Sequence, residues 1–177
     1  MRLTPYWIAA ALIALPLTAC SHQQADHPVV TPVLHHPEAS TARMGQDLPR
    51  YVWTLQEART AAGAPLDALM PAGHPPLQIV FEGTQMHVEH ACNAIGGTYR
   101  VQDGALKVDG LLHTMMACAD PALNRMEKAA LHVLQQTPQL SLIRTTAAPR
   151  LQMVTRDNET LLFVGKPKPD AASPSSP

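Results

Sequence analysis

Aromatic residues, charged residues and catalytic motifs are all scarce in this 177-residue chain. Only 4% of the residues are aromatic and 15% are charged, and the formal net charge is −1. Nucleic-acid-binding domains carry an excess of Lys and Arg, so this composition argues against nucleic acid as a partner. The sequence contains no Gly-x-Ser-x-Gly, His-Glu-x-x-His or P-loop pattern. We therefore expect no enzyme activity, no catalytic residue and no cofactor.

The chain also lacks an apolar run of the ~20 residues that a membrane-spanning helix needs. The apolar run over residues 7–17 is shorter, follows Arg2 and suits the middle of a secretory signal peptide. It leads into Leu-Thr-Ala-Cys at residues 17–20, which resembles the lipobox of bacterial lipoproteins. We expect cleavage of residues 1–19 and lipid on the thiol of Cys20; a non-lipidated signal with a chance cysteine is the alternative. The membrane is then a partner through this lipid.

The remaining chain divides by composition into three parts. Residues 20–49 contain four prolines and no clear apolar period, which predicts a lipidated cysteine followed by a tether. Residues 50–165 have the length and pattern of one domain. Residues 166–177 are rich in Pro and Ser and predict a disordered tail.

Short alternating segments dominate the expected domain. Strands are expected at residues 51–55, 77–81, 85–92, 98–101, 105–108, 141–144, 150–155 and 161–164. Asp120 and Pro121 predict a helix start, and the apolar stripe that follows ends near Gln136. Gly96 and Gly97 are interpreted as an isolated turn. This pattern predicts an α+β fold with one main helix and a small, mainly antiparallel sheet, which could close into a partial barrel; periodicity alone does not decide the closure.

Three cysteines are present, and Cys20 is assigned to the lipid. Cys92 and Cys118 then form an even pair in an oxidising compartment, for which a disulfide is the simplest account. Two buried free thiols are the alternative.

Soft metal ligands are comparatively abundant, with nine histidines and eight methionines. His90 and Cys92 would share one face of the expected strand at residues 85–92, and His113 lies near Met115 and Met116. Copper or zinc handling through His90 and His113 is therefore an alternative function. Because no regular ligand cage is present and methionine commonly fills cores, the sequence favours no metal site.

Two sequence motifs resemble the META domain family, to which the heat-shock protein HslJ belongs. Cys92-Asn93-Ala94-Ile95-Gly96-Gly97-Thr98-Tyr99 resembles the family's first motif, and Thr114-Met115-Met116-Ala117-Cys118-Ala119-Asp120-Pro121 resembles the second. Trp53-Thr54-Leu55 matches the opening of the family pattern, and Glu127 stands where the family places an acidic helical residue. The motif residues carried over by this resemblance are Trp53, Asn93, Gly97, Tyr99, Thr114, Asp120 and Glu127.

The resemblance implies an open conical barrel filled by its helix, and a protein connected with envelope stress and antibiotic tolerance. We expect a non-enzymatic lipoprotein on the inner leaflet of the outer membrane, facing the periplasm, that binds or assembles with an envelope protein. Asn93, Thr98 and Tyr99 are expected to organise a turn. A similarity of the fold to secretin pilot lipoproteins suggests a further alternative, a carrier of an acyl chain or peptide.

Overall fold

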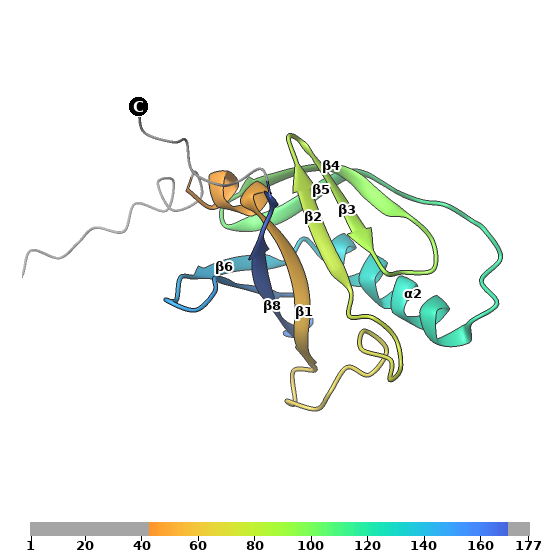
Figure 1. Ribbon diagram of the computed structural model, residues 1–177. Coiled ribbons are helices and arrows are strands. Elements are labelled where there is room, and N and C mark those ends of the chain that lie inside the picture. Colours follow the sequence, from red (N-terminus) through yellow and green to blue (C-terminus); the bar gives the residue numbers. More distant parts are fainter. Residues whose placement is uncertain (1–42, 170–177) are drawn as a thin grey trace, which may run out of the picture. The chain divides into compact units, whose positions relative to one another are not determined.

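Alternating apolar residues build eight strands in the computed structural model, which describes residues 43–169 (Figure 1). In the last strand, for example, Leu161 and Phe163 are buried while Leu162 and Val164 are only partly buried. The strands are β1 (Tyr51–Arg59), β2 (Gln78–Glu82), β3 (Gln85–Glu89), β4 (Ile95–Gln102), β5 (Ala105–His113), β6 (Gln139–Ile143), β7 (Arg150–Val154) and β8 (Thr160–Pro167). The main helix α2 spans Pro121–Gln135, and a short helix at residues 43–47 leads into the 3-10 turn η1 (Leu48–Arg50).

The sheet closes completely, so the expectation of an open or partial barrel was wrong. Each strand pairs antiparallel with the next, and β8 returns to pair with β1. The β5–β6 seam is the weakest junction, because only Ala105 and Gln139 pair across it. Two backbone hydrogen bonds flank that pair, from Leu106 N to Pro138 O (2.9 Å) and from Leu140 N to Gly104 O (2.7 Å). The open barrel was implied by the family resemblance, and periodicity alone did not decide how far the sheet closes.

Helix α2 begins and ends close to the residues predicted for it. Asp120 is extended and its side chain accepts a hydrogen bond from Ala122 N (2.7 Å), as an N-cap does. The buried face of the helix carries the expected apolar stripe of Met126, Ala130, Val133 and Leu134. This stripe packs on inward-facing side chains of the barrel, and the cavity that remains among them measures only about 10 Å³. The core is therefore filled.

The N-terminal helices belong to the packed domain. Met44 and Leu48 are buried in the hydrophobic core, and the indole Nε1 of Trp53 donates to Leu48 O at 3.0 Å. Residues 43–49, which the sequence pattern placed in the tether, are thus part of the fold. The expected signal peptide, Cys20 and the rest of the tether lie outside the described residues. Among residues 43–169, no helix is long and apolar enough to cross a membrane.

Candidate functional site

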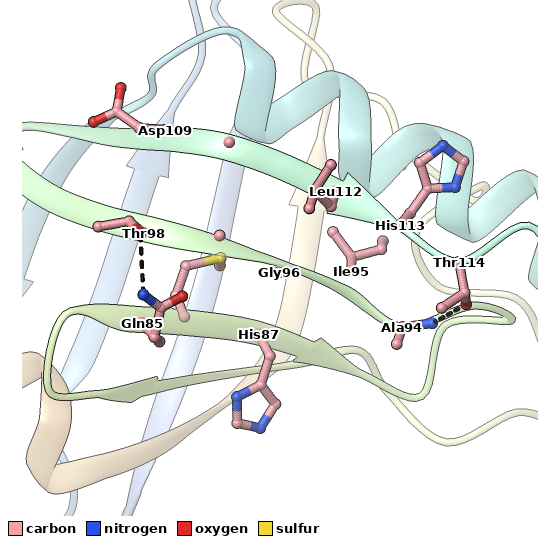
Figure 2. Close-up of a pocket in the computed structure, with 13 residues that line it drawn as sticks. Gln85, His87, Ala94, Ile95, Gly96, Thr98, Asp109, Leu112, His113 and Thr114 are labelled. Atoms are coloured by element: carbon pink, nitrogen blue, oxygen red, sulfur yellow. Dashed lines mark hydrogen bonds between the residues drawn. The ribbon is translucent and has the colours of Figure 1, made fainter.

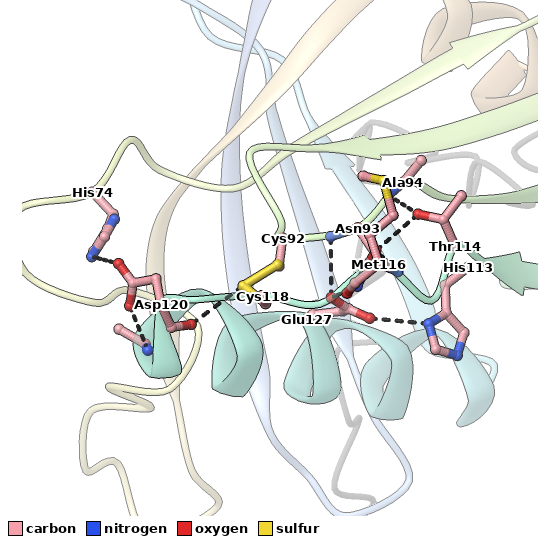
Figure 3. The surroundings of a disulfide bond; sticks show 11 residues. His74, Cys92, Asn93, Ala94, His113, Thr114, Met116, Cys118, Asp120 and Glu127 are labelled. Atoms are coloured by element: carbon pink, nitrogen blue, oxygen red, sulfur yellow. Dashed lines mark hydrogen bonds and ion pairs between the residues drawn. A yellow bond between two sulfur atoms is a disulfide. The ribbon is translucent and has the colours of Figure 1, made fainter.

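A disulfide fastens the segment after β3 to the segment before α2. Cys92 and Cys118 are bonded, with their Cα atoms 6.0 Å apart, as the cysteine count predicted (Figure 3). The bond brings the two motif segments together at the start of α2. It also holds the exposed loop at residues 114–119 close to the body of the barrel.

Asn93, next to the disulfide, ties this loop to the helix. It is buried, and its Oδ1 accepts from Thr114 Oγ1 (3.0 Å) and Met116 N (2.9 Å). Its Nδ2 donates to Met116 O (3.3 Å) and to Glu127 Oε2 (2.9 Å). Both polar atoms of the Asn93 side chain therefore form hydrogen bonds, to the loop at Thr114 and Met116 and to α2 at Glu127. Asn93 thus connects the segment after β3 both to the loop and to α2.

Glu127 is a buried acid whose hydrogen bonds are structural. Its side chain is on the buried face of α2, and Oε2 accepts from the backbone N of Asn93 at 3.1 Å as well as from its Nδ2. His113 Nδ1 lies 3.0 Å from Oε1, so an imidazole protonated on Nδ1 donates to it. Figure 3 shows the carboxyl group between Asn93 and His113. Glu127 thus joins α2 to both β5 and the segment after β3.

The two histidines of the metal alternative have separate roles. Strand β3 ends at Glu89, and His90 has a φ of +69°, so the prediction that His90 and Cys92 share a strand face was wrong. His90 Nδ1 lies 2.7 Å from Pro76 O, and His113 Nδ1 is used by Glu127. Within residues 43–169, no three His, Cys, Asp or Glu side chains gather as metal ligands.

A hollow of about 750 Å³ lies on the outer face of β3, β4 and β5, next to this network (Figure 2). Across the strands, His87, Gly96 and Leu112 are paired in one row. Gly96 has no side chain, so it forms a floor between the side chains of His87 and Leu112. The side chains of His87 and Leu112 form the two walls of the hollow. The strands that carry them, β3 and β5, are separated by two strand spacings, or about 10 Å. Gly96 and Gly97 therefore lie within β4 and are not the isolated turn that the sequence suggested.

A backbone irregularity shapes the same face. β5 carries one extra residue relative to β4 between Asp109 and Leu112, and Gly110 adopts a φ of +59° there. Opposite it, a Cβ on Gly97 would lie 2.7 Å from Val108 Cγ1 and 2.9 Å from Asp109 O. Gly97 is thus required for close approach of the two strands.

Three exposed apolar side chains lie near the end of β5, and we call Leu112, Met115 and Met116 the apolar rim. Their exposed fractions are 74%, 90% and 68%. Leu112 lines the hollow, and the two methionines directly follow Thr114, which also lines it. The prediction that both methionines fill the core was wrong. The sequence signal was hard to interpret because apolar residue type alone indicates burial, and nothing local shows that these side chains point outward.

The other motif residues support the core. Tyr99 packs edge-on against Phe81 with ring centroids 4.7 Å apart, and burial raises the pKa of its hydroxyl. It therefore packs in the core, whereas the sequence assigned it to a turn. Asp120 Oδ2 also lies 3.3 Å from His74 Nε2, which links the loop before β2 to the start of α2.

Comparison with known proteins identifies the family and the fold. A protein from Burkholderia xenovorans with an NMR structure aligns with a TM-score of 0.60 and 24% identity, over 82% of this chain and 99% of that one. A second protein solved by NMR aligns at 25% identity over 68% of this chain and 92% of its own, with a TM-score of 0.48. No curated protein matches the chain. The META domain model matches residues 46–168, well over half of the length, and the chain therefore belongs to the META domain family.

Proposed function

We propose that this protein is a non-catalytic binding module of the bacterial cell envelope. The observation that carries the proposal is the hollow between His87 and Leu112, together with the exposed Met115 and Met116 that follow its lining residue Thr114 in the chain. Adjacent apolar side chains that remain exposed in a folded domain mark interaction sites. Leu112 belongs to β5, and Met115 and Met116 belong to a loop held by a disulfide and by Asn93, so the shape of the rim is set before any partner arrives.

The proposed location in the envelope rests on the chemistry of the three cysteines. A disulfide is typical of proteins that fold in an oxidising compartment, and the periplasm is one. The lipobox predicts a lipid on Cys20 that holds the protein at the outer membrane, facing the periplasm. By its family, the protein would act in envelope stress or antibiotic tolerance.

The expected partner is an envelope protein that places an apolar side chain in the hollow. A fatty acid or peptide carried inside the barrel is disfavoured, because the cavity in the core holds no more than one water molecule's volume. The ligand cavities of carriers measure hundreds of cubic ångströms. The outer hollow has that size and faces solvent, so binding there needs no opening of the barrel.

The test is site-specific photo-crosslinking in intact envelopes. A photoreactive residue at position 112 should give a discrete product, and His87→Ala, on the opposite wall, should reduce its yield severalfold. The matched control is the same residue at Ile143, an exposed apolar position on β6 that does not line the hollow. The proposed binding site would be contradicted if position 143 gave the same crosslinked product in equal yield. It would also be contradicted if His87→Ala left the yield from position 112 unchanged.

A further inference from the structure

The methionines of this domain divide into two exposure classes. Met115 and Met116 are 90% and 68% exposed, and Met70 is 39% exposed. The other described methionines, Met44, Met86, Met126 and Met153, are all buried. Thioether oxidation requires that an oxidant reach the sulfur, so exposure predicts which residues react.

The loop that carries Met115 and Met116 is held without their sulfurs. Asn93 accepts from Met116 N and donates to Met116 O, and the disulfide at Cys118 follows two residues later. Thr114 is fixed by its hydroxyl, which donates to Asn93 Oδ1, and by its backbone N, which donates to Ala94 O at 3.0 Å. A change of chemistry at either thioether therefore leaves the contacts that fold the loop intact.

We propose that Met115 and Met116 form an oxidant-reactive modification site that regulates the apolar rim. The oxidant class is hydrogen peroxide. Each thioether sulfur gives two electrons and forms an S–O bond, the O–O bond of the peroxide breaks, and one water leaves with both protons. The products are methionine sulfoxides, the reversible step of methionine oxidation.

Oxidation converts the rim from apolar to polar. A sulfoxide oxygen is a strong hydrogen-bond acceptor that prefers water, so burying it under an apolar partner side chain is unfavourable. Only Leu112 would stay apolar among the three rim residues. Binding at the hollow should therefore weaken when both sulfurs are oxidised. This loss of binding rests on the proposed function, whereas the oxidation of the two sulfurs does not.

The first experiment is peptide mapping after mild peroxide treatment of the folded, exported protein. After the treated protein is unfolded and the Cys92–Cys118 disulfide is reduced, cleavage after Lys107 and Arg125 releases a peptide in which Met115 and Met116 are the only methionines. This peptide should gain about 32 Da, one oxygen per sulfur, on the order of tenfold faster than the peptides with Met126 or Met153 are modified. The melting temperature should stay unchanged when the gain is complete.

The proposal of a modification site would be overturned if Met153 were oxidised as fast as Met115 and Met116. It would also be overturned if the melting temperature fell as the two rim methionines were modified. The control is the double variant Met115→Leu and Met116→Leu, which keeps apolar, exposed side chains at both positions. In this variant the peptide should gain no mass under the same treatment.

The second experiment repeats the crosslink from position 112 before and after peroxide. The yield should fall severalfold in the natural sequence and stay constant in the double leucine variant. A fall of equal size in the leucine variant would show that oxidation acts elsewhere and would overturn regulation by the rim. Absence of any crosslink before treatment would count against the binding function, while the mass gain would still decide the modification site.

Discussion

At the scale of single residues, Glu127 shows how a buried acid can be structural. The hydrogen bonds to its carboxyl group come from donors of Asn93 and His113, and the residue is buried on the inner face of α2. Removing such an acceptor leaves buried donors without partners, which costs more than the bonds contribute.

We expect Glu127→Ala to lower the free energy of unfolding by about 3 kcal/mol, and Glu127→Gln by less, because the amide keeps one carbonyl acceptor. Urea unfolding followed by circular dichroism measures both. Glu89→Ala, at a half-exposed carboxylate beside His87, is the control and should change the value by less than about 0.5 kcal/mol. A loss at Glu127 no larger than at Glu89 would show that the network contributes nothing.

Gly97 gives a second residue-scale prediction. A methyl group there would meet Val108 and the backbone of β5, so Gly97→Ala should destabilise the domain by about 2 kcal/mol. Gly45→Ala is the matched control, because Gly45 is helical and nothing lies within 4 Å of the position that a Cβ would take there. That change should be neutral or stabilising by up to about 1 kcal/mol. Equal thermal shifts for the two variants would refute the argument from close packing.

The candidate site is less predictable from sequence than the residues that support it. The two motifs contain Asn93 and both cysteines of the disulfide, and the position of the family's acidic helical residue adds Glu127. The hollow was not predicted because it depends on the space that Gly96 leaves by having no side chain. That space becomes apparent only when His87 and Leu112 are known to lie on either side of Gly96. Local pattern cannot show neighbours on other strands.

At the scale of elements, the sequence predicted all eight strands and the helix in order. Alternation and turn residues are local, as in the hairpin at Asp103-Gly104, where both residues have positive φ. The limits were less well predicted: β5 continues to His113, beyond the expected end at residue 108, because the irregularity at Gly110 interrupts its alternation. Closure of the barrel depends on pairing between distant strands, which periodicity does not encode.

The disulfide is an element-scale constraint between β3 and α2. It spans 26 residues of sequence, and in the chain-entropy model a loop of that size stabilises the fold by about 3 kcal/mol. Reduction, or paired Cys92→Ser and Cys118→Ser changes, should lower the free energy of unfolding by that amount in urea titrations. Reductant added to the serine variant is the control and should have no further effect. An unchanged midpoint after complete reduction would contradict this prediction.

At the scale of the whole molecule, the domain is one part of a chain whose first 42 residues lie outside the described structure. We expect radiolabelled palmitate to enter the protein in growing cells and to be lost in Cys20→Ser, because the lipobox places the acylated thiol there. Cys92→Ser is the control and should keep the label. A label that survives Cys20→Ser would contradict lipid attachment at this residue.

The pairing of β1 with β8 also sets when the domain can fold. These strands are the first and last of the barrel, and they pair along their length from Tyr51 with Pro167 to Arg59 with Thr160. When the chain emerges N-terminus first, from a ribosome or across a membrane, β1 lacks its partner β8 until the last residues of the domain have followed. The barrel is therefore completed only at the end of emergence, and until then one edge of β1 is unpaired and open to pairing with another chain.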